Sequence, residues 1–222
     1  MANWAFGCDS DTNNNSCGNS FYIGRLGYGT TYDPLWNPPS GVTTFSFWNI
    51  QGPSDAPSGT TYTAWGQDQA TAYYNNWLQN GKGSNATLFG SVSAGSGGWT
   101  STISDNQEVV DGFLNQLAYL TGTEVAATFG LYGSLSSEFQ DLLDASNWAS
   151  PQPIVVWLAN VPDTPPDCSG AESEFCSWNK YSIGGYAPVI WQYSQYPDLD
   201  VTPYGDQIST GMFYTQAYPG FC

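Results

Sequence analysis

Short apolar runs rich in β-branched and aromatic residues alternate along this chain with stretches of helical spacing. Several runs are apolar throughout, which is typical of strands that are buried on both faces of a parallel sheet. The predicted strands are Trp4–Cys8, Phe21–Leu26, Thr44–Trp48, Thr87–Val92, Thr128–Tyr132, Ile154–Leu158 and Val189–Tyr193. Strand and helix in alternation favour an α/β architecture with mainly parallel strands.

Three helices are predicted between these strands, at Ala64–Asn80, Asp105–Thr121 and Ser136–Ser146. The second has one apolar stripe, formed by Val109, Val110, Phe113, Leu114 and Leu117. Other connections, such as Pro34–Val42, are too short for a helix. Because no linker interrupts the chain, we expect residues 1–222 to form a single domain, an irregular (β/α) TIM-type barrel.

The charge balance excludes several functions. Nineteen acidic residues face three basic ones (Arg25, Lys82 and Lys180), there is no His, and the net charge is −16. Nucleic acids and anionic membranes both need clustered Lys and Arg, and no apolar run is long enough for membrane insertion. Without His there is no Ser-His-Asp triad and no His-ligated zinc, so we expect no metal and no cofactor. Carboxylates remain as the abundant acid–base groups.

Four of the five cysteines lie in two pairs that are close in sequence, and the fifth has no such neighbour. The spacing predicts the local disulfides Cys8–Cys17 and Cys168–Cys176, although a four-cysteine metal site without CxxC spacing is the alternative. Disulfides persist in oxidising compartments, so we expect a secreted, extracellular protein. Cys222 is left over, either free or available for self-association with a second copy.

The last predicted strand leads into the aromatic residues Trp191 and Tyr193, and the acidic pair Asp198 and Asp200 follows on an expected loop. At the C-terminal end of a parallel barrel, such residues would offer a carboxylate and rings that stack on sugars.

Two charged residues near other strand ends have alternative interpretations. Asp9 ends the first predicted strand, but by position alone it is more typical of the start of a turn. Arg25 is the only arginine, and on a barrel strand it needs a partner. It either forms an internal ion pair with a carboxylate or positions a substrate.

Five motifs follow one another along most of the chain. They are Gly7-Cys8-Asp9, residues 23–30 (IGRLGYGT) with Asp33, residues 130–134 (GLYGS), residues 156–159 (VWLA) and residues 191–194 (WQYS) with Asp200. Their order resembles the lysozyme-type barrel of glycoside hydrolase family 25 and the related DUF1906 glycoside-hydrolase-like domains. The resemblance implies a barrel that cleaves the glycosidic bonds of peptidoglycan or a similar polysaccharide.

The resemblance also implies roles for individual residues. Asp9 and Asp200 would orient substrate or stabilise charge, with Asp198 as the substitute for Asp200. Arg25 would hold a carboxylate. The rings expected to line the sugar cleft are Trp99, Trp157, Trp191 and Tyr193.

One departure from the family pattern concerns the middle strand. Ser91 and Ser93 occupy the positions where the family carries Asp and Glu. Two carboxylates two residues apart on a strand project into one cleft, as glycoside hydrolysis requires, but serine does not supply the proton. The chain is therefore expected to be inactive as written. Three explanations stay open. The chain is a natural pseudoenzyme, it is an engineered variant whose carboxylates were replaced, or Ser91 and Ser93 do not correspond to the acidic positions of the family.

Two further functions stay open beside the hydrolase-like one. The low charge density, the many tyrosines and the leftover cysteine also suit a non-catalytic surface or self-assembly protein. A glycan-binding, lectin-like module is the third.

Overall fold

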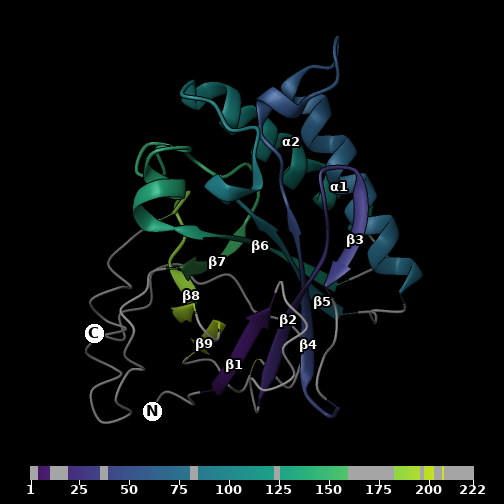
Figure 1. Cartoon of the computed structure of the whole chain (residues 1–222), viewed down its shortest axis with the longest axis vertical. Helices are drawn as coiled ribbons and strands as arrows, with labels where there is room; N and C mark the ends of the chain where they lie inside the picture. The colour runs from purple at the N-terminus through teal and green to yellow at the C-terminus, as the bar shows by residue number, and fades with distance from the viewer. Residues whose placement is uncertain are drawn as a thin grey trace.

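The computed structural model describes residues 5–10, 20–35, 40–80, 85–122, 126–159, 183–195, 198–202 and 207. Nine strands of this part of the chain form one sheet, and helices cover part of its outer face (Figure 1). The strands are β1 (Ala5–Ser10), β2 (Phe21–Tyr28), β3 (Thr31–Leu35), β4 (Thr43–Asn49), β5 (Asn85–Ser91), β6 (Ala126–Ser134), β7 (Ile154–Ala159), β8 (Pro188–Gln195) and β9 (Asp198–Thr202). The helices are α1 (Tyr62–Gln79) and α2 (Ile103–Thr121), with the 3₁₀ turns η1 (Pro53–Asp55) and η2 (Ala94–Ser96) and the π-helix η3 (Leu135–Gln140).

The sheet closes on itself. The strands β1, β2, β4, β5, β6, β7 and β8 run parallel to one another, β3 lies antiparallel beside β2, and β9 lies antiparallel between β8 and β1. Gly7 of β1 is in register with Asp200 of β9 on one side and with Phe21 of β2 on the other. The fold is therefore an irregular α/β TIM-type barrel, as the alternating pattern predicts.

Two strands differ from the expectation. Residues 198–202 form β9 rather than a loop, because this segment pairs with both β8 and β1 and so satisfies backbone groups that would otherwise form open sheet edges. Residues 31–35 form β3, an edge strand whose one partner among the described strands is β2. Pro34 argues against a central strand but is tolerated at an edge.

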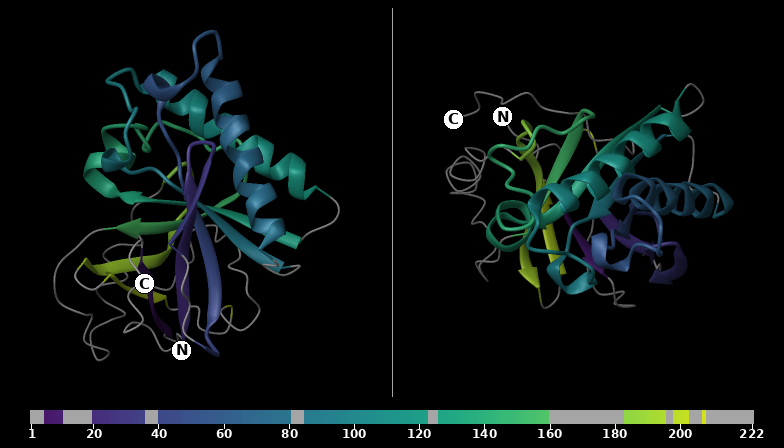
Figure 2. Two further views of the ribbon diagram at one scale, coloured as in Figure 1. Left: turned by 45° about the vertical axis from the view of Figure 1, so that its right-hand side comes forward. Right: turned by 90° about the horizontal axis from the view of Figure 1, so that it is seen from above.

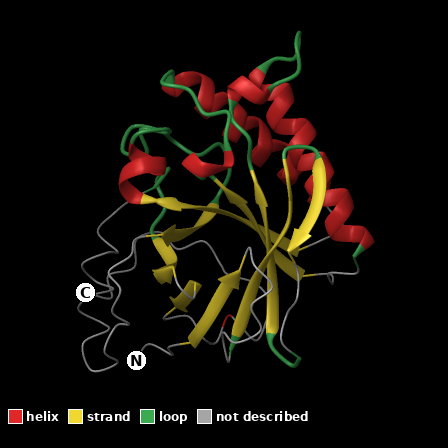
Figure 3. Cartoon of the chain, in the orientation of Figure 1, coloured by secondary structure: helices red, strands yellow, loops and turns green. Residues whose placement is uncertain are grey.

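Two of the three predicted helices are present in the structure. The first two are confirmed to within two residues at each end, as α1 and α2. The third prediction, Ser136–Ser146, is wrong: this region contains the π-helix η3 and then turns. The two long helices pack against each other on one side of the barrel (Figures 2 and 3). They approach closely, since a Cβ on Gly66 of α1 would clash with the backbone carbonyl oxygen of Val109 on α2.

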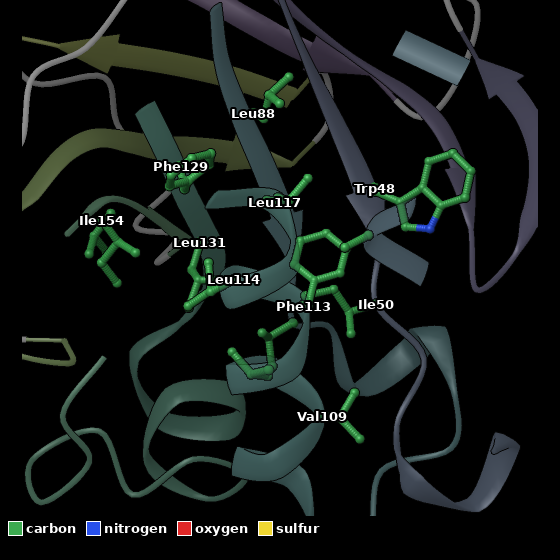
Figure 4. Packing of buried hydrophobic residues seen from close by; sticks show 14 of the residues in the cluster. Trp48, Ile50, Leu88, Val109, Phe113, Leu114, Leu117, Phe129, Leu131 and Ile154 are labelled. Atoms are coloured by element: carbon green, nitrogen blue, oxygen red, sulfur yellow. The ribbon is translucent and has the colours of Figure 1, made fainter. Parts of the chain in front are cut away.

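Two apolar clusters lie on the two faces of the barrel wall. The interior cluster contains Ala5, Phe21, Ile23, Phe45, Phe47, Phe89, Val155, Trp157, Val189 and Ile190. The outer cluster lies between the sheet and the helices and includes Trp48, Leu88, Phe113 and Leu131 (Figure 4). Alternation along β4 puts Phe47 inside and Trp48 outside, as expected for a pleated strand.

None of the helices that the structure describes is at once long enough and apolar enough to cross a membrane.

Candidate functional site

Polar residues face the barrel interior toward the C-terminal ends of the parallel strands. Ser91, Tyr132 and Trp157 are in register across β5, β6 and β7, so their side chains point to the same face. Trp157 belongs to the interior cluster, so all three side chains face inward. The site is built on strands, which hold side chains more rigidly than loops do.

Asp9 lies within β1 and is nearly buried, with 7% of its surface exposed. The Nε2 of Gln192 on β8 donates hydrogen bonds to both of its carboxylate oxygens, at 2.9 and 3.2 Å. The Oε1 of the same amide accepts a 2.7 Å hydrogen bond from the Tyr132 hydroxyl. The interpretation of Asp9 as a turn residue is therefore wrong, because its carboxylate is held inside the barrel.

Asp200 is fully buried on β9, opposite Gln192 in the β8–β9 register. Its Oδ1 accepts a 2.8 Å hydrogen bond from Trp157 Nε1. The Trp157 ring lies against the Tyr132 ring, with 4.2 Å between centroids. Asp9, Gln192, Tyr132, Trp157 and Asp200 thus form one connected set, which we call the interior network.

Of the two serines expected on the middle strand, Ser91 lies on β5 beside this network, in register with Tyr132. Ser91 faces inward and is 1% exposed. Ser93 follows the end of β5 with extended backbone and precedes η2, and its carbonyl oxygen accepts a 2.9 Å hydrogen bond from Trp99 Nε1. The end of β5 and the residues after it therefore carry hydroxyl groups, from Ser91 and Ser93, and no carboxylate.

A carboxylate that the sequence analysis missed lies next to this strand end. Glu138 of η3 accepts hydrogen bonds from the backbone N–H of Ser134, at 2.7 Å, and of Ala94, at 3.2 Å. Each of its oxygens accepts one of these bonds, so Glu138 connects η2, the turn that follows β5, to the end of β6. The signal in the sequence was an acidic residue four positions after a strand, which alone is not specific.

Arg25 lies on β2 in register with Phe47, an interior residue. Its guanidinium forms an ion pair with Asp33, with 3.2 Å between Nη2 and Oδ2. The predicted pairing with a carboxylate is present, but the partner is a half-exposed residue of β3 rather than Asp9 or Asp200.

The predicted sugar-binding rings have different surroundings. Trp191 is 1% exposed and packs in the outer cluster, in register with the outward-facing Leu158. We therefore leave Trp191 out of the site. Trp157 is fully buried and holds Asp200, and Trp99 is partly exposed. Tyr193 and Asp198 lie on β8 and β9 by their backbones, and their side chains lie outside the described part of the structure.

Cys8 on β1 is disulfide-bonded. Cys17, Cys168, Cys176 and Cys222 lie outside the described residues, so the pairs Cys8–Cys17 and Cys168–Cys176 stay predictions. Over the described ranges, no group of three or more His, Cys, Asp and Glu side chains is arranged to hold a metal ion.

Comparison with known proteins gives structural relatives only. No protein family profile and no curated protein sequence matches the chain. The modular autolysin LytC from Streptococcus pneumoniae, solved in complex with a synthetic peptidoglycan ligand, aligns with a TM-score of 0.56 and 11% identity, covering 89% of this chain and 46% of LytC. A muramidase from Acremonium alcalophilum aligns with a TM-score of 0.53 and 14% identity, covering 88% of this chain and 92% of the muramidase.

An uncharacterized B. stearothermophilus protein aligns with a TM-score of 0.50 and 15% identity, covering 89% of this chain and 94% of that protein. The chain thus spans about half the length of LytC and nearly all of the other two. At these identities the likeness shows a shared barrel fold, one that an autolysin and a muramidase use.

Proposed function

We propose that this chain is a secreted, glycoside-hydrolase-like barrel that binds peptidoglycan or a similar polysaccharide without cleaving it. The observation that carries the proposal is the interior network beside Ser91: two carboxylates are held inside the barrel, while β5 contributes a hydroxyl group. The fold likeness to a peptidoglycan-bound autolysin and to a muramidase supports the class of ligand.

The chemistry of the network suits a sugar. Sugar hydroxyls both donate and accept hydrogen bonds, and carboxylate, amide and phenol groups complement them. Tyr132 combines an aromatic face with a hydroxyl that already takes part in the network. Of the network residues, Tyr132 is the one that is only partly buried, so it is the member we expect to contact a ligand.

Binding without cleavage follows from the residues at the end of β5. Glycoside hydrolysis needs a carboxylic acid that protonates the leaving oxygen and a second carboxylate on the other side of the bond. Ser91 and Ser93 offer neither group, and the chain has no His to activate a serine as nucleophile. Glu138 is nearby, but both of its oxygens accept backbone hydrogen bonds.

Secretion is supported by the disulfide at Cys8, because structural disulfides persist mainly in oxidising compartments.

The test is a sedimentation assay with insoluble peptidoglycan and with chitin, combined with a reducing-end assay. We expect the protein to sediment with the glycan and to release no reducing ends. Tyr132→Phe should weaken binding because it removes the hydroxyl that fixes Gln192. Tyr119→Phe is the matched control, since Tyr119 is 79% exposed on α2. Release of reducing ends would identify a hydrolase, and absence of binding would overturn the proposal.

Self-association through Cys222 is the second candidate, favoured by the odd number of cysteines. Size-exclusion chromatography with and without reductant tests it. Covalent oligomers that reductant dissolves would support it, and a monomer in both buffers would remove it.

A further inference from the structure

Arg25 uses its hydrogen-bonding capacity incompletely. A guanidinium has five N–H donors, and among the described residues Arg25 makes one hydrogen bond, from Nη2 to Asp33 at 3.2 Å. Its Nε is buried and has no hydrogen-bond partner among the described residues. A buried donor without a partner costs free energy, so the resting arrangement leaves a binding capacity that a ligand can use.

The guanidinium lies toward the C-terminal end of the barrel. Arg25 is in register with Phe47, and Tyr28, further along β2, is in register with Asn49. Phe47 faces the interior, so Asn49 and Tyr28 lie on that same face of the wall. Tyr28 is 36% exposed, which places an accessible aromatic residue on the strand that carries the guanidinium.

Asp33 is a weak partner for Arg25. Its side chain is 53% exposed, and the pair has a single contact of 3.2 Å rather than a bidentate one. Exposed ion pairs of this kind contribute little, because water competes for both charges. A ligand carboxylate that bonded to Nε and one Nη together would form the stronger, fork-shaped arrangement.

We propose that Arg25 binds the carboxylate of an acidic sugar, which displaces Asp33, while the Tyr28 ring packs against the same sugar. This inference rests on the proposed function and specifies its ligand as a carboxylate-bearing polysaccharide. A chain of net charge −16 repels such a polymer at long range, so recognition needs a local cation. Arg25 supplies it on the face that carries the interior network.

The experiment compares two tetrasaccharides by titration calorimetry at one ionic strength. One is neutral chitotetraose, and the other is a peptide-free peptidoglycan tetrasaccharide, in which alternate sugars carry a lactyl carboxylate. We expect the acidic probe to bind more tightly. Arg25→Gln should weaken its binding by about 10- to 100-fold, the range for a hydrogen bond to a charged group, and should leave the neutral probe unchanged.

Three further variants sharpen the test. Asp33→Asn removes the competing carboxylate and should tighten binding of the acidic probe several-fold. Arg25→Lys keeps the charge but loses the fork, so it should bind the acidic probe less tightly than wild type. Lys82→Gln makes the same change in net charge as Arg25→Gln and should have no effect. Thermal unfolding of Arg25→Gln checks that the fold is kept.

The outcomes separate the two proposals. Equal binding of both probes, unaltered by Arg25→Gln, overturns the role of Arg25 and leaves glycan binding in place. If Asp33→Asn binds the acidic probe more weakly than wild type does, the proposed role of Arg25 is also overturned. If wild type binds neither probe, the proposed function fails and this inference fails with it.

Discussion

The Nε2 of Gln192 lies 2.9 Å from Oδ1 of Asp9, a side-chain contact between residues 183 positions apart in the chain. It joins the last parallel strand of the barrel to the first, although β9 lies between them. The other end of the amide accepts the Tyr132 hydroxyl. A glutamine serves here because its amide donates at one end and accepts at the other.

Gln192→Glu is expected to destabilise the protein at neutral pH. The substitution keeps the shape of the side chain but replaces the donor to Asp9 with an acceptor, in a position that is 2% exposed. Leaving a buried polar group unsatisfied costs about 1–3 kcal/mol, so the free energy of unfolding in urea should fall by that amount.

The control for this substitution is Gln152→Glu. Gln152 donates an exposed 2.8 Å hydrogen bond to Asn115, so its loss should cost less than about 0.5 kcal/mol. Similar losses for the two variants would show that the amide of Gln192 does not hold Asp9 in solution.

Trp157→Phe should cost more stability than Trp99→Phe. Both tryptophans donate one hydrogen bond from Nε1, but Trp157 donates to the buried Asp200 carboxylate and Trp99 to the carbonyl oxygen of Ser93. Hydrogen bonds to charged groups contribute about 1.5–3 kcal/mol and neutral ones about 1 kcal/mol. Chemical denaturation of the two variants measures the difference, and equal losses would contradict the buried contact of Asp200.

The barrel could be predicted from the sequence because its strands are short and apolar and because two recognisable helices, α1 and α2, separate β4, β5 and β6. Seven of the nine strands of the described structure have matching apolar runs. The two exceptions, β3 and β9, contain Pro34, Asp198 and Asp200, residues that argue against a strand. Their pairing depends on neighbours far away in the chain, which local pattern does not report.

The direction of side chains on β8 explains why Trp191 was assigned to the wrong face. Strict alternation from Val189 would turn Trp191 inward and Gln192 outward. The β7–β8 register instead shifts between Val156 and Trp157, and both Val189 and Ile190 pack in the interior cluster. An irregularity of one residue flips every later side chain, so Gln192 rather than Trp191 enters the network.

From the sequence, Asp9 and Asp200 could be assigned to one site only through the family resemblance. Their partners Gln192, Tyr132 and Trp157 come from three different strands, and the register that brings them together is not encoded locally. Glu138 was missed for the same reason, since its role depends on the position of Ala94 in η2, the turn that follows the neighbouring strand β5.

Restoring carboxylates on β5 should create hydrolytic activity. Ser91→Asp together with Ser93→Glu would place two carboxylates where the family resemblance predicts them, with Asp9 and Asp200 already held inside the barrel. We expect release of reducing ends from any glycan that the wild type binds. The free energy of unfolding should also fall, because Ser91 is 1% exposed and a buried carboxylate without a partner is costly.

The matched control adds the same charge at exposed positions, as Ser101→Asp with Ser104→Glu before and at the start of α2. That variant should show no activity. If the Ser91/Ser93 variant folds and releases nothing, the two serines do not occupy the acid positions.

Asp111 gives the protein a pH-dependent component of stability that is separate from the site. Burial raises the pKa of the Asp111 carboxyl above its ordinary value of 3.8, an effect that the hydrogen bond from Trp148 Nε1 opposes and the nearby Glu108 reinforces. The folded protein therefore holds this proton more tightly than the unfolded chain does. The resulting stabilisation is fully present at pH values below 3.8 and is lost as the pH rises through the raised pKa.

Asp111→Asn should remove this component, because an asparagine keeps an acceptor for Trp148 and does not ionise. Urea denaturation across the acidic range measures it as the difference between variant and wild type. Relative to wild type, the variant should gain stability as the pH rises through the raised pKa. Asp68→Asn, at an exposed position on α1, removes the same charge and corrects for the general effect of the net charge. If the two variants show the same dependence on pH, the buried position of Asp111 has no influence on its ionisation.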